Sequence, residues 1–278
     1  MKLFYWNIKD AITDEKKLWI ENAINSEEPD ILCIAEGPES IDDCNKIQDF
    51  IVNKGYKTYY SPTYYSQNVI SNQFGWNKYG LKVFIKSSII LKTRFAFGNQ
   101  KLEGRIIYLR FEIDKKYYST FLIHGMSKAG DEINQNSFIC ELSSFIRAKA
   151  IGKEADHVII LGDFNIEPWD DLLKNKKYIH SFFYSKSFTY HSIKLTNRIY
   201  YNPIFDYIQK NTDNNLIGTF YNDKYISVLD YPLISKEINN YDFNILTSIG
   251  GKSLMKQKNG KHFLSDKLDH LPITLKIN

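Results

Sequence analysis

The chain has 278 residues, of which 43% are hydrophobic and 15% aromatic, and its 36 basic and 32 acidic side chains give a net charge of +4. Intrinsic disorder needs low hydrophobicity together with high net charge, so this composition excludes disorder for the bulk of the chain. The three cysteines, Cys33, Cys44 and Cys140, are odd in number and have no C-x-x-C spacing, which excludes a disulfide framework and a zinc knuckle.

The length allows one large domain or two smaller ones. No internal repeat and no linker rich in proline, glycine or serine interrupts the chain, so we expect a single domain over residues 1–278. No segment reaches the ~20 apolar residues of a membrane span. Polar Asn7 and Lys9 interrupt the first apolar run, so no signal peptide is expected. The expected location is the cytoplasm, and no obligate protein partner is evident.

Strand-like segments alternate with helical ones in the first part of the chain, a pattern typical of sheets covered by helices. The first helix is expected to begin after Thr13, whose side chain can cap it, and to reach Asn25. A second helix ends near Gly55, and the clearest helix, residues 135–150, has apolar residues with i, i+3, i+4, i+7 spacing. The predicted strands are residues 3–8, 31–35, 81–85, 105–113, 117–124, 158–161, 227–234 and 273–277, with 105–113 and 117–124 pairing as a hairpin.

Two of the apolar strands run directly into a carboxylate. Glu36 follows residues 31–35, and Asp163 follows residues 158–161 after one glycine. A carboxylate at the end of a core strand is costly unless it is paired, hydrogen-bonded or bound to a metal ion. Separate single carboxylates suit Mg²⁺, which completes its coordination with water and phosphate oxygens. The alternative is that both acids are surface turn residues, because Gly-Asp and Glu-Gly-Pro are also good turn sequences.

Further polar residues stand beside other predicted strands in a fixed order. The whole set consists of Asn7, Glu36, Asp163, Asn165, Asp230, Asp269 and His270. In this order, and with its Gly162-Asp163-Phe164-Asn165 segment, the chain resembles the endonuclease/exonuclease/phosphatase superfamily of metal-dependent phosphoesterases. The resemblance extends from Asn7 to Ile273. His124, which ends the strand 117–124, matches the first catalytic histidine of the deoxyribonuclease and phosphatase branches.

The resemblance implies a four-layer α/β/β/α sandwich, in which two mixed β-sheets are flanked by helices and the site lies at one edge, across the strand ends. It implies that Glu36 and Asn7 hold Mg²⁺, or Mn²⁺ in its place, with Glu36 as the principal ligand and Asp269 as a further one. The match to Asp163 orients the attacking water or binds metal.

The remaining matched residues are implied to bind the phosphate and move protons. Asn165 hydrogen-bonds the phosphate, and Asp269 fixes the tautomer of His270 so that the other ring nitrogen can take or hold a proton. His124 and Asp230 complete the expected catalytic set. This division of labour is chemically reasonable, because hydrolysis of a phosphodiester needs an activated water, a Lewis acid and donors for the developing charge.

Several residues depart from the family pattern. Leu268 stands where the closing Ser-Asp-His motif has serine, and a separate Ser-Asp pair occurs at Ser265 and Asp266. The abasic-site branch has asparagine in place of His124, although Gly104 and Arg105 are part of a Glu-Gly-Arg segment like that of the same branch. We therefore expect Arg105 to bind substrate, while the partner of His124 stays unassigned.

A window without acidic residues lies between Phe50 and Leu102. Its eight basic residues are interleaved with aromatic ones, so Lys57, Lys78 and Trp76 are candidate contacts to nucleic acid. The alternative is a tyrosine-rich loop with ordinary solvated lysines.

The sequence thus predicts a divalent-metal-dependent phosphodiesterase that hydrolyses DNA or RNA, with nucleic acid as its partner. A second interpretation keeps the site but gives it a phospholipid, an inositol phosphate or a nucleotide as substrate. A third is a non-catalytic binding protein with the same fold.

Overall fold

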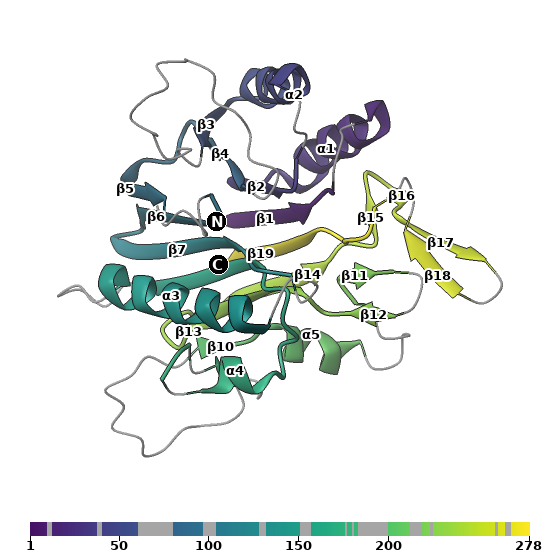
Figure 1. The fold of residues 1–278 in the computed structure, drawn as a ribbon. Helices are drawn as coiled ribbons and strands as arrows, with labels where there is room; N and C mark the ends of the chain where they lie inside the picture. Colours follow the sequence, from purple (N-terminus) through teal and green to yellow (C-terminus); the bar gives the residue numbers. More distant parts are fainter. Residues whose placement is uncertain are drawn as a thin grey trace.

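The computed structural model describes residues 1–9, 13–37, 41–60, 80–96, 104–127, 132–150, 157–175, 177–179, 181–182, 200–211, 218–222, 225–258, 261–264 and 268–278. In this part of the chain, two large mixed β-sheets lie face to face, and helices cover their outer faces (Figure 1). The predicted four-layer α/β/β/α sandwich is therefore confirmed. None of the described helices is long and apolar enough to cross a membrane.

The first sheet has six strands and places the N-terminal strand at its centre. β1 pairs in parallel with β2 and antiparallel with β19, so the chain's first and last strands are neighbours. The helices α1 (Asp14–Glu27) and α2 (Ile41–Asn53) lie over its outer face (Figure 1). In spatial order the strands are β14 (Tyr241–Ile245), β19 (Ile273–Ile277), β1 (Lys2–Asn7), β2 (Ile31–Ala35), β4 (Lys82–Lys86) and β3 (Tyr56–Tyr60).

The second sheet has seven strands and is built around the parallel pair β7 and β8. The helices α3 (Glu132–Ala150) and α4 (Asp171–Lys174) lie on its outer side (Figure 1). Its strands are, in spatial order, β5 (Leu91–Ala96), β6 (Ile106–Ile113), β7 (Lys116–His124), β8 (His157–Asp163), β13 (Asp230–Ser235), β10 (Tyr200–Tyr201) and β9 (Ser181–Phe182).

Three two-stranded ribbons gather at the end of the sandwich toward which β1 runs (Figure 1). They are β11 (Phe220–Tyr221) with β12 (Ile226–Ser227), β15 (Ser248–Ile249) with β16 (Lys252–Ser253), and β17 (Met255–Lys258) with β18 (Lys261–Leu264). The short helix α5 (Ile204–Lys210) contacts β14.

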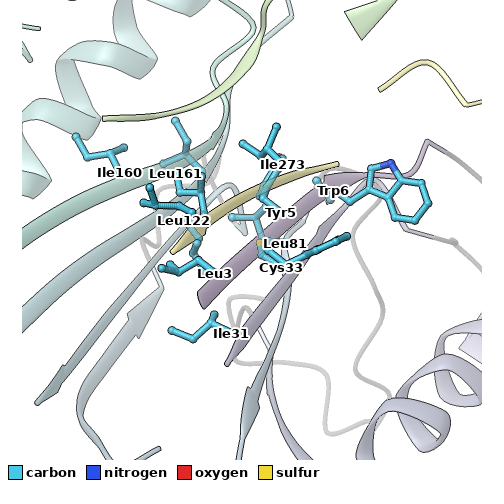
Figure 2. Close-up of a cluster of buried hydrophobic side chains, with 14 of the residues drawn as sticks. Leu3, Tyr5, Trp6, Ile31, Cys33, Leu81, Leu122, Ile160, Leu161 and Ile273 are labelled. Carbon is cyan, nitrogen blue, oxygen red and sulfur yellow. The ribbon is translucent and has the colours of Figure 1, made fainter. Parts of the chain in front are cut away.

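The core lies between the two sheets. Alternation along β1 sends Leu3 and Tyr5 to one face, and Figure 2 shows them on the side of Leu122 and Leu161 of the second sheet, while Trp6 points away. All five side chains are at most 1% exposed. At roughly 25 cal/mol per Å² of buried apolar surface, this inter-sheet layer is the main source of stability and holds the two sets of strand ends in a fixed relation.

Local sequence signals explain several element boundaries. Thr13 caps α1 as predicted, because its side chain accepts a 3.2 Å hydrogen bond from the backbone of Lys16. The helix continues past Asn25 to Glu27 and ends at Glu28, which is left-handed. The single strand predicted over residues 227–234 is instead two strands, β12 and β13, since the backbone N–H groups of Leu229 and Asp230 both donate to the Thr219 hydroxyl at 2.9 Å.

Candidate active site

Three adjacent strands of the second sheet place polar side chains next to one another at one edge of the sheet. His124, at the end of β7, is the register partner of Asp163 at the end of β8, which is also the partner of Asp230 at the start of β13. Register partners project from the same face of a sheet, so the three side chains form a row. Each is no more than 2% exposed.

The strand ends of the first sheet meet this row. Asn7 ends β1, and its Nδ2 donates to Oδ2 of Asp163 at 3.2 Å. Glu36 directly follows the parallel neighbour β2, and its Oε1 lies 3.0 Å from Nε2 of His124. Glu36 is thus a partner of His124, which the sequence left unassigned, and the two sheets share a single site.

Three residues beside these strand ends have left-handed backbone. The φ angles are 43° at Lys9, 50° at Glu36 and 52° at Asn165. For residues other than glycine this conformation costs roughly 1–3 kcal/mol and is concentrated at functional sites. Here it turns the chain sharply, so that Glu36 faces His124 and the N–H of Asn165 donates to Oδ1 of Asp163 at 2.7 Å.

His270 completes the row from the segment that precedes β19. Its Nδ1 lies 2.7 Å from Oδ2 of Asp230, and its Nε2 lies 3.9 Å from Oδ2 of Asp163. The prediction that Asp269 fixes the imidazole tautomer is wrong, because neighbouring residues of an extended chain point to opposite sides. Asp230, which comes from the adjacent sheet, contacts the ring instead. The indole of Trp6 donates to the carbonyl of His270 at 3.0 Å and holds its backbone.

Asp269 pairs with a lysine rather than with the imidazole. Its Oδ2 lies 2.7 Å from Nζ of Lys9, whose side chain is 46% exposed. The other oxygen, Oδ1, is buried and has no hydrogen-bond partner among the described residues, and the same is true of Oδ1 of Asp230. A buried carboxylate oxygen without a donor is costly, so both atoms indicate a place for a cation or for ordered water.

The carboxylates also perturb one another. Burial disfavours the charged form of Glu36, but hydrogen bonds from His124 and Asn7 outweigh burial and lower the pKa of Glu36 to about 2. Burial and the nearby charge of Asp230 raise the pKa of Asp163. Burial alone would lower the pKa of His270, but the charge and hydrogen bond of Asp230 raise it. These shifts have the causes expected where negative charge is concentrated in a buried site.

The loop after β7 supports Asn165. The carbonyl of Gly125 accepts hydrogen bonds from Arg105 at 2.8 Å and from Nδ2 of Asn165 at 3.2 Å. Gln135 of α3 donates to the carbonyl of Asn165 at 2.8 Å. A Cβ at position 125 would lie 2.3 Å from the carbonyl oxygen of Phe164, so only glycine allows this approach.

A cleft of about 590 Å³ lies at this site. One side is polar, and the other is formed by the β11–β12 ribbon, where Tyr225 and Ile226 are 55% and 46% exposed. The ring of Phe220 lies 5.9 Å from that of Tyr225 and 4.9 Å from that of His270. The lining also includes Glu36, Arg105, His124, Asp163, Asn165, Glu167, Ser227, Asp269 and His270.

Of the residues predicted to contact substrate, only some lie at the cleft in the described part of the chain. Arg105 lines the cleft, although it also donates to the carbonyl of His124 at 3.2 Å and so supports the loop. Lys57 is exposed on the edge strand β3 and does not line the cleft. Lys78, Trp76 and the Ser265-Asp266 pair lie outside the described residues.

Sequence reasoning missed the residues that support the site from a distance. Gln135, the hydroxyl of Thr219 and the aromatic pair Phe220 and Tyr225 carry no motif that separates them from ordinary helix and turn residues. Thr219 and Phe220 belong to the Gly-Thr-Phe-Tyr segment at 218–221, but no spacing connects this segment to the other site residues.

The donor set fits a hard divalent cation. Glu36 and Asp269 offer oxygen atoms at the cleft, and the Oδ1 of Asp269, which has no hydrogen-bond partner among the described residues, most directly favours a cation there. Asn7, beside Asp163, has an amide oxygen that could serve as a further ligand. Asp163, Asp230 and His270 form a second group with ligand atoms within 4.8 Å of one another. In that group the imidazole Nδ1 already bonds to Asp230, which suits proton transfer better than metal ligation.

Comparisons with known proteins agree with this geometry. No protein-family model matches the chain, and no curated protein matches it. Among solved structures, the human nocturnin catalytic domain with bound sulfate is similar with a TM-score of 0.63 and 18% identity, over 100% of this chain and 93% of that one. The 3′ phosphatase NExo from Neisseria, bound to a product DNA hairpin, is similar with a TM-score of 0.57 and 15% identity, over 100% of this chain and 99% of that one.

A third similar structure contains the expected metal. It is a variant of beta toxin from Staphylococcus aureus with bound magnesium ions, with a TM-score of 0.58 and 16% identity over 100% of this chain and 99% of that one. At these identities the likeness concerns the fold. The chain therefore has the fold of the endonuclease/exonuclease/phosphatase superfamily, to which these neighbours belong.

Proposed function

We propose that the protein is a divalent-metal-dependent phosphodiesterase that hydrolyses nucleic acid. The observation that carries the proposal is the arrangement around His270. Its Nδ1 is held by Asp230, and its Nε2 is directed toward Asp163, in a cleft that Glu36 and Asn165 also line. This gives one imidazole a fixed orientation beside carboxylates that can hold water and metal, which is what attack of water on a phosphodiester requires.

The chain's own residues would orient the reactants and exchange protons. Asp163 would hold the attacking water, and His270 would exchange a proton at Nε2 while Asp230 stabilises the charged imidazole. Asn165 is held with its side chain at the cleft and would donate a hydrogen bond from Nδ2 to a phosphate oxygen in exchange for the carbonyl of Gly125.

Glu36, Asn7 and Asp269 would hold the divalent cation. When bound, a Mg²⁺ or Mn²⁺ ion supplies a Lewis acid for a non-bridging phosphate oxygen. His124, at 3.0 Å from Glu36, would then act on that carboxylate as a positioning residue. The likeness to a structure with bound magnesium supports this choice of ion.

Nucleic acid is favoured as the substrate by the form of the cleft. Aromatic side chains on the β11–β12 ribbon offer surfaces on which bases can stack beside the reacting phosphate. The NExo neighbour with its DNA hairpin supports the same substrate class. The proposed location of this activity is the cytoplasm.

A substrate panel tests the proposal. Purified protein would be incubated with Mg²⁺, Mn²⁺ or excess chelator and with single- and double-stranded DNA and RNA, sphingomyelin, inositol phosphates, nucleotides and bis(p-nitrophenyl) phosphate. We expect metal-dependent cleavage of an oligonucleotide. A His270→Ala protein from the same preparation controls for contaminating nucleases. Cleavage confined to lipid, inositol phosphate or nucleotide substrates would favour a phosphoesterase of small or lipid substrates over a nuclease. Absence of turnover with every substrate would contradict the proposal that the protein is an enzyme.

A further inference from the structure

One face of the β11–β12 ribbon carries side chains that line the cleft. Phe220 and Ser227 are register partners, so their side chains share a face of the ribbon. The ring of Tyr225 lies 5.9 Å from that of Phe220 and belongs to the same face. All three residues line the cleft, and a β-bridge between Phe220 and His270 holds this end of the ribbon beside the imidazole.

The loop after β8 adds a carboxylate to this face. Glu167 comes two residues after Asn165 and lines the same cleft. The hydroxyl of Ser227 donates a hydrogen bond to Oε1 of Glu167 at 2.7 Å. Ser227 is 9% exposed, whereas Glu167 is half-buried. The serine therefore fixes the carboxylate of Glu167 against the face of the ribbon that carries the two aromatic rings.

The fold makes little use of the charge on Glu167. In the described part of the chain, the Ser227 hydroxyl is the one hydrogen-bond partner of this side chain, and no basic residue pairs with it. The turn of the loop depends on backbone atoms, because the carbonyl of Glu167 accepts a 3.0 Å hydrogen bond from the N–H of Asp170. Oε2 of Glu167 is thus left for a partner outside the described residues.

This carboxylate opposes the binding of phosphate. The cleft already contains Glu36, Asp163 and Asp269, and a further negative charge repels an anionic group. A carboxylate only accepts hydrogen bonds, with about two acceptor sites on each oxygen, so Oε1 keeps one site when Ser227 donates to it. The favourable contact of Glu167 is therefore with a neutral part of the substrate that donates hydrogen bonds.

A base stacked on Tyr225 presents donors of this kind at its edge. Adenine and cytosine each place one amino group beside an acceptor, and thymine or uracil places an acceptor on both sides of its single N–H. Guanine has two adjacent donors, N1–H and the N2 amino group, and these match the two oxygens of a carboxylate. In a duplex both donors are paired with cytosine, so they are free only when the base is unpaired.

We propose that Glu167 is a specificity-determining residue that accepts hydrogen bonds from N1–H and the N2 amino group of an unpaired guanine, stacked on Tyr225 beside the cleaved phosphate. The identity of the ligand rests on the proposed function. Ser227 is the positioning residue, because its hydroxyl orients the carboxylate.

A ribose is the other part of a nucleotide that offers two neighbouring donors, its hydroxyl groups. The base is favoured because Ser227 fixes Glu167 on the face of the ribbon that carries Phe220 and Tyr225. Aromatic side chains in a groove for single-stranded nucleic acid stack on bases. Substrates made of DNA lack the 2′-hydroxyl and separate the two sources.

The test measures base preference. The parent protein, Glu167→Gln, Ser227→Ala and the control Glu112→Gln are each given single-stranded DNA of random sequence with Mg²⁺ or Mn²⁺, and the product ends are sequenced. A defined oligonucleotide is then compared with one in which the preferred guanine is replaced by inosine, which lacks the N2 amino group. Glu112 is exposed, pairs with Lys92 and lies at the opposite end of β6 from Arg105.

We expect the parent to cleave beside guanine about 10-fold more often than beside thymine, and to cleave the inosine oligonucleotide about 5-fold more slowly than the guanine one. Glu167→Gln should lose both preferences, because the amide replaces one acceptor with a donor that opposes the base. Ser227→Ala should reduce them, and Glu112→Gln should retain them. A purely structural role of Glu167 would change the rates with guanine and inosine by the same factor and leave their ratio intact.

The possible failures point to different errors. Equal cleavage beside all four bases, or a guanine preference that survives in Glu167→Gln, would overturn the role of Glu167 and leave the proposed function intact. A preference for another base that depends on Glu167 would overturn the assignment of guanine. A preference for RNA over DNA of any sequence, lost in Glu167→Gln, would move the contact to the ribose. If the parent cleaved no oligonucleotide, the proposed function and the role of Glu167 would both be wrong.

Discussion

Nδ1 of His270 lies 2.7 Å from Oδ2 of Asp230, and Asp230 is the register partner of Asp163 on the neighbouring strand. One carboxylate therefore fixes the imidazole, while the next one faces the opposite ring nitrogen at 3.9 Å. Asp230 is fully buried, and its backbone N–H is held by the hydroxyl of Thr219. The orientation of His270 is thus set by the fold before any substrate binds.

Asp230→Asn should lower kcat by roughly 10³–10⁴-fold, because the amide no longer stabilises the charged imidazole or its tautomer. The effect should be strongly non-additive with His270→Ala, since an orienting carboxylate has no role once the ring is gone. Asp269→Asn is the matched control and should combine additively with His270→Ala. Single-turnover rates of the single and double variants measure both combinations. If Asp269→Asn were non-additive with His270→Ala and Asp230→Asn were additive, Asp269 would be the partner of the imidazole.

Glu36→Gln should abolish most of the thermal stabilisation that Mg²⁺ gives the protein. A ligand at 100 times its Kd stabilises a folded protein by about 2.7 kcal/mol, and removing the principal charged ligand weakens binding. Melting temperature against Mg²⁺ concentration measures the effect without reference to turnover. Glu21→Gln, which removes only a surface ion pair with Lys54, serves as control. A full Mg²⁺ response in Glu36→Gln would exclude Glu36 as the principal ligand.

Lys9→Met should tighten Mg²⁺ binding, because it removes the ammonium group 2.7 Å from Asp269 and leaves that carboxylate free for a cation. A half-exposed ion pair is worth at most ~1 kcal/mol, so the gain in affinity should be about 5-fold or less. The same thermal titration applies. Lys17→Met, which breaks an exposed pair with Asp14, should leave the affinity unchanged. Weaker metal binding in Lys9→Met would show that Asp269 is not a ligand.

The main elements of the fold could be predicted because their signals are local. The buried apolar segment of β2 matches its predicted bounds, and the 3.6-residue spacing of α3 identifies the helix. The carboxyl ends of neighbouring strands meet at one edge of a sheet, so carboxylates such as Glu36 and Asp163 could be assigned to a common site from the sequence.

The pairing within the site could not be predicted, because it depends on register and on the contact between sheets. Asp230 and His270 are 40 residues apart, one at the start of β13 and the other in the segment before β19, so no spacing rule connects them. Asp269 is adjacent to His270 in the sequence and was therefore predicted as the partner of its ring. Neighbouring residues of an extended chain point to opposite sides, and the Asp269 carboxylate pairs with Lys9 instead. The break between β12 and β13 likewise depends on the Thr219 hydroxyl, a contact from a different segment of the chain.

Ile160→Ala should destabilise the protein by about 2–5 kcal/mol, since Ile160 lies on the central strand β8 and is 0% exposed. Ile90→Ala makes the same chemical change at a side chain that is 74% exposed and should alter the free energy of unfolding by no more than ~0.5 kcal/mol. Urea denaturation of both variants and the parent protein measures the two changes in the free energy of unfolding. Comparable losses at the two positions would contradict the burial of Ile160 in the second sheet.

Tyr225→Ala should weaken the binding of oligonucleotides by ~1–3 kcal/mol, because its exposed ring lies on the cleft wall 5.9 Å from Phe220 and offers a stacking surface. The loss should appear in KM, with kcat nearly unchanged, since Tyr225 is assigned no part in proton transfer. Tyr117→Ala is the matched control, because that ring stacks on Arg110 near the start of β7, at the opposite end of this strand from His124. An oligonucleotide with abasic positions beside the cleaved bond should not distinguish Tyr225→Ala from the parent protein. If the variant showed the same drop in affinity for abasic and normal oligonucleotides, Tyr225 would be shaping the ribbon and not stacking on bases.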